Sequence, residues 1–443
     1  MTHRHPWHCT SPRRLRALLL FFLLASFAIA IFSPDLPAQS QTITQSERKP
    51  LFDTYRSFQD RLAAIAAVAD ESQRDAQLDD LWTQLKRAGK IPYVQDDHAA
   101  FLYRGPADSV AIAGDFNGWN PAQESWQAKQ LAGTDLWMLE KSFPADARVD
   151  YKIVIDGAIW TLDPSNPLQV MSGFGPNSEL RMPTYKYPEE TIRRPDVARG
   201  TLTDAVKTKS AKLGYDVNYR VYTPAGYSKE NPHRLPVVYV TDGHEYAADA
   251  MGSMVVVLDN LIAAKSLQPT IAVFIDPRDP ATGENRRASL YLQNANFAAF
   301  LADELVPTID AAYRTLASPA GRTILGTSLG GLNSAYIGAT RSDVFGNLAV
   351  QSPASFPKFA PQTLDLYATQ PLRKKLKIYI TAGTIGDGNG GVEFADLLKH
   401  GYDYKFTQHN EGHSWGQWRG LLDDILIELI GPLPSPPPSH VER

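Results

Sequence analysis

Apolar strand patterns and helical patterns alternate along residues 200–431. The runs LPVVYVTDG (235–243) and TIAVFID (270–276) are almost continuously apolar and end in polar loops, as strands buried on both faces of a parallel sheet do. Stretches with helical spacing lie between or after such runs, at 249–266, 296–314 and 329–341. This alternation predicts an α/β domain built on a doubly wound sheet.

Residues 96–187 follow a different pattern. Short strand-like runs, among them SVAIAGDF and VDYKIVIDG, are separated by Gly, Pro, Asn and Asp at roughly regular spacing. This spacing predicts an immunoglobulin-like β-sandwich, and the charged, proline-containing segment 188–200 predicts a domain boundary after it. Residues 48–90 carry apolar side chains at helical spacing, which predicts a short helical segment that packs against a neighbour.

Both ends of the chain differ from these domains. Residues 1–38 contain PRRLR, an uncharged apolar run of 16 residues (17–32) and then small and polar residues. The run is short for a membrane span, so it predicts a cleaved signal peptide, with an uncleaved N-terminal anchor as the alternative. Residues 432–443 form a proline-rich tail.

Composition and charge exclude some classes of function. A length of 443 residues predicts two or three domains, and 43% hydrophobic with 21% charged residues is typical of globular proteins. Residues 1–38 hold four arginines against one aspartate, so the formal net charge of −4 becomes −7 without them. No basic surface remains for nucleic acid. The single cysteine, Cys9, lies before the apolar run, so the exported protein would have no disulfide or thiolate chemistry.

The segment RTILGTSLGGLNS (322–334) contains the pentapeptide Gly-x-Ser-x-Gly around Ser328. A chain of this length contains that pentapeptide by chance with a probability of about 0.15, so its context decides the interpretation. A short β-type run precedes Ser328 and a helical pattern follows it. Glycines at 326 and 330 would relieve crowding in a sharp strand-to-helix turn, which predicts Ser328 as a nucleophile.

A nucleophilic serine needs a histidine base, and four histidines follow Ser328. His413 lies in a glycine-containing loop after the last strand pattern, where loops line the ligand crevice of an α/β sheet. The other three occupy a helix end, a strand edge and the tail: His400, His409 and His440. His413 is therefore the predicted base. The pair His409 and His413 does not predict a zinc site, since Gly412 argues against a helix there and no third ligand is evident.

The acid that orients the histidine should follow another strand between Ser328 and His413. Asp387 lies in such a place, in KIYITAGTIGDGNGG, whereas the alternatives Glu393 and Asp396 lie on the next predicted helix. The backbone N–H groups of Leu329 and of Gly243 or His244 are the predicted oxyanion donors. This chemistry needs no cofactor and no metal.

With these residues placed, residues 200–431 resemble the putative esterase family of α/β-hydrolases, which includes enterochelin esterase and feruloyl and acetylxylan esterases. The matching stretches include VVYVTDG, the segment around Ser328 and EGHSWGQWR. The resemblance implies a serine esterase with Ser328, Asp387 and His413 as its triad. Two positions depart from the family pattern: Ser289 replaces a frequent Glu, and Glu411-Gly412 replaces a glycine pair, which places a carboxyl group close enough to influence the pKa of His413.

Residues 96–187 resemble glycogen-binding and isoamylase-type early-set domains, on the stretches VAIAGDFNGWNP, YKIVIDGAIWTLDPSNP and GPNSEL. The resemblance implies possible carbohydrate binding by Trp119, Lys152, Trp160 and Asn177, because indole rings stack on sugars and Lys or Asn bonds their hydroxyls. The alternative is that the tryptophans serve core or interdomain packing.

The sequence as a whole predicts an exported, periplasmic or secreted serine esterase. The expected substrate is an acyl, feruloyl or acetyl ester of carbohydrate. Trp415 and Trp418 are candidate contacts for an aromatic ring, with packing of the last helix as the alternative for Trp418. Three alternatives stay open: a catecholate siderophore esterase, an acyltransferase, and a non-catalytic carbohydrate-binding protein. The expected partner is a small-molecule or polysaccharide ester, with no nucleic acid and no membrane after signal removal. The sequence does not define the oligomeric state.

Overall fold

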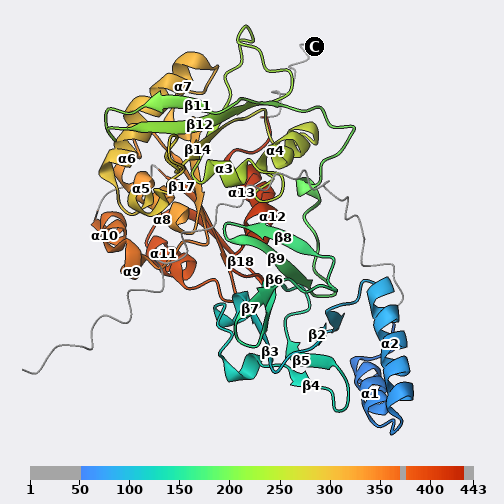
Figure 1. Ribbon diagram of the computed structural model, residues 1–443. Coiled ribbons are helices and arrows are strands. Elements are labelled where there is room, and N and C mark those ends of the chain that lie inside the picture. The colour runs from blue at the N-terminus through green and yellow to red at the C-terminus, as the bar shows by residue number, and fades with distance from the viewer. Residues whose placement is uncertain (1–50, 370–375, 434–443) are drawn as a thin grey trace, which may run out of the picture. The chain divides into compact units, whose positions relative to one another are not determined.

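The computed structural model describes residues 51–369 and 376–433, and the predicted signal and tail lie outside them, apart from residues 432 and 433 (Figure 1). The chain begins with helices α1 (Tyr55–Ala66) and α2 (Glu71–Arg87), whose first turns are capped by the side chains of Thr54 and Asp70. Their apolar faces share one buried cluster with side chains of the sheet that follows. The predicted helical segment therefore packs against a neighbour, as its periodicity indicated.

Two antiparallel sheets follow. One has the order β1-β2-β5-β4 and contains Tyr93–Gln95, His98–Arg104, Leu136–Ser142 and Lys129–Gln130. The other has the order β3-β6-β9-β8, with β7 also on β6, and contains Val110–Gly114, Arg148–Ile155, Gly175–Arg181, Gln169–Ser172 and Ile159–Thr161. Alternate residues of both sheets meet in one buried cluster around Phe101 and Tyr151. The first strand begins at Tyr93, three residues before the predicted start, and the early-set identity of this region stays a prediction.

A nine-stranded sheet organises the rest of the chain. Its order is β10-β12-β14-β13-β15-β16-β17-β18, with β11 also paired to β12. In chain order, the strands are Thr201–Leu202 (β10), Val206–Lys209 (β11), Asp216–Thr223 (β12), Val237–Val240 (β13), Ile271–Asp276 (β14), Arg322–Thr327 (β15), Asn347–Gln351 (β16), Lys377–Gly383 (β17) and Asp403–His409 (β18). The strands from β14 to β18 in that order are parallel, and β12 joins β14 antiparallel. The predicted α/β arrangement is confirmed.

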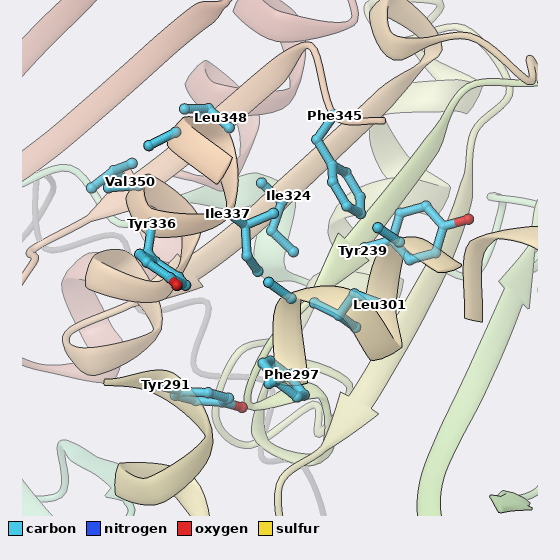
Figure 2. Close-up of a cluster of buried hydrophobic side chains, with 14 of the residues drawn as sticks. Tyr239, Tyr291, Phe297, Leu301, Ile324, Tyr336, Ile337, Phe345, Leu348 and Val350 are labelled. Atoms are coloured by element: carbon cyan, nitrogen blue, oxygen red, sulfur yellow. The ribbon is translucent and has the colours of Figure 1, made fainter. Parts of the chain in front are cut away.

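Successive residues of the central strands supply two cores, one on each face of the sheet. Ile324 of β15 belongs to the cluster that packs under α8, and the next residue, Leu325, belongs to the cluster on the opposite face. Figure 2 shows Ile324 close to Ile337 of α8, with Leu348, Phe345 and other members of the first cluster around them. The continuous apolar runs in the sequence arise because both faces of these strands are buried.

Helices cover both faces of this sheet. Their bounds are Gly243–Tyr246 (α3), Met254–Ala263 (α4), Arg287–Tyr291 (α5), Ala295–Ala299 (α6), Val306–Ala312 (α7), Leu329–Thr340 (α8), Phe356–Phe359 (α9), Pro361–Thr369 (α10), Gly390–Leu398 (α11), Trp415–Gly420 (α12) and Leu422–Leu429 (α13). The predicted helix 296–314 is interrupted by a π-helical turn over Phe300–Leu305. Within the described ranges, the structure contains no helix of the length and apolar character that a membrane span requires.

Candidate active site

Ser328 occupies the turn between strand β15 and helix α8. Its φ of 58° and ψ of −116° are strained for a residue with a side chain, and the surrounding packing keeps them. A Cβ at Gly326 would lie 2.3 Å from Thr241 Oγ1, and one at Gly330 would lie 2.7 Å from the same atom. Only glycine fits at both places, which explains the sequence pattern around Ser328 in physical terms.

The structure brings together the three residues that the sequence singled out. His413 Nε2 lies 2.9 Å from Ser328 Oγ, and His413 Nδ1 lies 2.5 Å from Asp387 Oδ1. The Asp387 side chain is 1% exposed and its Oδ2 accepts a short hydrogen bond from the backbone N–H of Gly383. The His413 ring is one-third exposed. The arrangement is a chain of hydrogen bonds from a buried carboxylate to an accessible hydroxyl.

The alternative acids are engaged elsewhere. Glu393 accepts hydrogen bonds from Ser355 Oγ and the backbone N–H of Phe356, and Asp396 pairs with Lys399 at 2.6 Å. His409 is the last residue of β18. Among the described residues, no group of three His, Cys, Asp or Glu side chains is arranged to hold a metal ion.

The backbone N–H groups of Leu329, Gly243 and His244 donate no hydrogen bond within the described part of the chain. Leu329 begins α8, and Gly243 and His244 begin α3, so all three lie at helix N-termini, where N–H groups lack intrahelical partners. A Cβ at Gly243 would lie 2.3 Å from the backbone of Phe274 and Ile275, so this turn is pressed against β14. These donors could bind a developing negative charge.

An arginine joins the two segments that carry these donors. Arg287 Nε lies 2.9 Å from both carboxylate oxygens of Asp242, and its Nη2 donates to the carbonyl of Thr327 at 3.0 Å. Asp242 precedes Gly243 and Thr327 precedes Ser328, so Arg287 fixes their spacing. The sequence alone did not indicate this link, although Arg287 lies two residues before Ser289, where the chain departs from the family pattern.

The loops that carry His413 and Asp387 lie against the smaller antiparallel sheets. Arg148 of β6 is fully buried and donates from its Nη1 to Ser414 Oγ at 2.6 Å and from its backbone N–H to the carbonyl of Asn410 at 3.0 Å. Its guanidinium pairs with Asp150 at 2.6 Å and with Glu179 at 2.7 Å. The histidine loop is therefore attached to β6 on both sides of His413.

Asp115, which follows β3, touches both loops. A Cβ at Gly386 would lie 1.9 Å from the Asp115 carbonyl oxygen, and one at Gly412 would lie 2.1 Å from Asp115 Oδ2. Burial, followed by the charge of Asp150, raises the pKa of Asp115 well above its ordinary value. These contacts explain why glycine stands beside Asp387 and beside His413. We name the contacts of Arg148 with the loop of His413, and of Asp115 with both loops, the seam.

Glu411 at the seam gives a pH-dependent prediction. Burial raises the pKa of its carboxyl from 4.5 to about 7. The unfolded chain therefore loses this proton at a lower pH than the native protein does. Below about pH 4.5 both states keep the proton, and the free energy of unfolding falls as the pH rises from there through 7. Relative to the wild type, Glu411→Gln should gain about 1–3 kcal/mol in free energy of unfolding between pH 4.5 and pH 8.

Urea unfolding of both proteins at several pH values measures this difference. Glu284→Gln serves as the control, because that side chain is 68% exposed, and its curve should follow that of the wild type. A pH-independent difference between Glu411→Gln and the wild type would contradict the assignment.

The four predicted carbohydrate contacts are in different environments. Trp160 is 44% exposed, and it shares a face with Lys152, since Val154 pairs with Trp160 and alternate residues face the same side. Trp119 is half-buried, and its indole counteracts part of the burial that raises the pKa of the Asp115 carboxyl. Asn177 is 6% exposed and donates to Asp150 Oδ2 at 3.0 Å. Carbohydrate binding by these four residues stays a prediction, and the amide of Asn177 already donates to a partner inside the protein.

The predicted aromatic contacts of the substrate are also buried. Trp415 and Trp418 are 3% and 6% exposed and belong to the core on one face of the large sheet. The rings of Trp418 and His413 pack nearly perpendicular to each other, with 4.9 Å between centroids. Both therefore support α12 and the histidine and are not available as a surface for a substrate ring.

Residues 210–429 match the family model described as "Putative esterase". In sequence, the chain is 27% identical over 237 residues to the uncharacterized protein YjcH of Bacillus subtilis, covering 50% of this chain and 94% of that protein. It is 29% identical over 246 residues to an endo-1,4-beta-xylanase/feruloyl esterase of Xylanibacter ruminicola, covering 54% of this chain and 32% of that protein.

Two solved structures share the fold. The enterobactin esterase of Shigella flexneri has a TM-score of 0.62 at 21% identity, over 75% of this chain and 92% of that chain. The ferric enterobactin esterase of Salmonella typhimurium has a TM-score of 0.63 at 20% identity, over 75% of this chain and 93% of that chain. At these identities the likeness establishes a common fold.

Proposed function

Residues 210–429 belong to the putative esterase family, and from this premise we propose that the chain is a serine carboxylic-ester hydrolase that works through an acyl-enzyme. One observation carries the proposal: Ser328 Oγ, His413 and Asp387 form a continuous line of hydrogen bonds of 2.9 and 2.5 Å. A serine hydroxyl becomes a nucleophile when a histidine accepts its proton, and a carboxylate stabilises the charged imidazole.

In the proposed mechanism, Ser328 Oγ attacks the ester carbonyl carbon while His413 Nε2 takes the hydroxyl proton. The carbonyl oxygen becomes an oxyanion, which the N–H groups of Leu329 and of Gly243 or His244 stabilise. His413 then returns the proton to the leaving alcohol as the C–O bond breaks. Water, activated by the same imidazole, attacks the acyl-enzyme and releases the acid. Asp387 holds His413 in the tautomer that accepts at Nε2.

The proposed substrates are acyl, feruloyl or acetyl esters of carbohydrate. The relative named as a xylanase/feruloyl esterase supports this class, and the exposed Trp160 beside Lys152 offers a surface for a sugar ring. A catecholate siderophore ester is the second candidate, supported by the fold shared with two enterobactin esterases. We further propose that the protein acts after export, on the basis of residues 1–38, and that residues 96–187 form an early-set domain.

An ester panel and a covalent probe test the proposal together. The protein without residues 1–38 should hydrolyse 4-nitrophenyl acetate and at least one of methyl ferulate, acetylated xylan and a catecholate siderophore. A fluorophosphonate should stop this hydrolysis at one equivalent and leave its adduct on Ser328, located by peptide mass spectrometry. An adduct elsewhere, or hydrolysis that survives full labelling, would contradict the mechanism. Acyl transfer to an added sugar in place of hydrolysis would identify an acyltransferase.

A further inference from the structure

The hairpin between β8 and β9 carries at its tip the most exposed large apolar side chain of the described residues. Phe174 is 96% exposed, compared with 44% for Trp160. The backbone of the tip is nevertheless held in place. Ser172 Oγ donates to the carbonyl of Gly175 at 2.7 Å and accepts from the N–H of Phe174 at 3.2 Å. The ring is thus presented to solvent by a fixed turn.

This hairpin contacts two helices of the proposed active site, α12 next to His413 and α3 with the proposed oxyanion donors. Strand β8 lies against α12, the helix that begins two residues after His413 (Figure 1). At the tip, a Cβ on Gly173 would lie 3.1 Å from Glu245 Oε1. Glu245 belongs to α3, whose first N–H groups are the oxyanion donors of Gly243 and His244. Phe174, the next residue after Gly173, is therefore adjacent to the segment that would receive the ester carbonyl.

A single exposed apolar residue needs no explanation in itself. The position of Phe174 gives it a use, because the aromatic residues adjacent to His413 in sequence, Trp415 and Trp418, are buried and cannot cover a substrate. An exposed phenyl ring gains contact energy when an apolar or aromatic group packs against it, and edge or offset stacking adds to this gain. A substrate bound at Ser328 would supply that group.

We propose that Phe174 is a specificity-determining residue whose ring packs against an aromatic ring attached to the scissile ester. The proposal rests on the proposed esterase function and names its preferred substrate class: esters with an aryl group on the acyl or the alcohol side. Phe174 lies in a hairpin turn of the five-stranded antiparallel sheet, so that sheet would contribute directly to substrate selection.

Phe174→Ala and three esters test this inference. Methyl ferulate carries the ring on the acyl side, phenyl acetate carries it on the alcohol side, and methyl butyrate has none. The variant should lose about tenfold in kcat/KM on methyl ferulate, phenyl acetate or both, mainly through KM, and stay within about twofold on methyl butyrate. Phe174→Tyr should retain the aryl preference. Ile427→Ala removes another exposed apolar side chain, on α13, and should change none of the three rates.

Equal losses on all three esters, or no loss on either aryl ester, would overturn the inference. Calorimetric binding of ferulic acid to wild type and Phe174→Ala gives a readout that needs no turnover. If the wild type hydrolyses no ester yet binds ferulic acid about tenfold more tightly than the variant, the esterase proposal fails and the contact stands. If both bind ferulic acid equally, the contact fails whatever the activity.

Discussion

Replacing Ser328 with alanine should lower kcat for ester hydrolysis by about 10⁶-fold, because the hydroxyl is the only nucleophile that the arrangement presents to the carbonyl. In enzymes of this mechanism, loss of the nucleophile removes nearly all of the catalysis that the triad provides, and the oxyanion donors leave a residual about 10³-fold above water. The fold should remain, since the hydrogen bond of Ser328 Oγ to His413 is the only one its side chain makes within the described residues. The strained φ of 58° belongs to the backbone and is nearly as costly for alanine as for serine.

Steady-state kinetics on 4-nitrophenyl acetate, with circular dichroism to verify folding, measures this effect. Ser334→Ala is a matched control, because Ser334 lies in the same helix, α8, and its buried hydroxyl has no hydrogen-bond partner within the described residues. The control should keep wild-type kcat. Retention of more than about 1% of activity by Ser328→Ala would show that another group performs the chemistry.

Replacing Asp387 with asparagine should lower kcat by about 10⁴-fold, and the reason lies in the second oxygen of the carboxylate. Asp387 Oδ2 accepts from the N–H of Gly383, whereas Oδ1 faces His413 Nδ1. Asparagine has a single oxygen, and the buried N–H of Gly383 requires it as an acceptor. The amide NH₂ would then face His413 Nδ1 and force the imidazole into the tautomer with a proton on Nε2, which cannot accept the proton of Ser328.

The expected signature is a fall in kcat with little change in KM, since Asp387 does not touch substrate in the proposed mechanism. Asp396→Asn is the control, because that carboxylate pairs with Lys399 on the surface of α11 and should leave kcat unchanged. An activity loss of less than about tenfold for Asp387→Asn would mean that another group orients His413.

The sequence was sufficient to predict the large sheet and the neighbourhood of Ser328. The apolar runs of β13 and β14 indicate burial on both faces. Ser328, Asp387 and His413 each lie in a segment that follows a strand of the large sheet. Loops at the carboxyl ends of parallel strands converge, so position in sequence translated into proximity in space.

Other features have no local signal. Trp415 and Trp418 lie on a short helix whose position relative to the core decides their burial, and sequence alone does not give that position. Asn177 is bonded to Asp150, and this partner is determined by the register of β6 and β9. The contact between Arg148 and Ser414 joins residues 266 positions apart, which no periodicity can reveal. These burial states and contacts depend on how helices and strands pack together, which the sequence pattern of a single helix or strand does not contain.

Because of the seam, the large sheet depends on the smaller antiparallel sheets for the positions of two of its loops. Strand β15 and helix α8 hold the proposed nucleophile, Ser328, within the large sheet. The loops of the proposed acid and base contact Asp115, which follows β3, and Arg148 of β6. Asp115 and Arg148 approach the backbone so closely that no side chain would fit at Gly386, Gly412 or Gly416. In evolutionary terms, the large sheet that carries the proposed triad would depend on the smaller sheets. A lineage that discarded the smaller sheets would have to rebuild both loops before it regained an aligned triad.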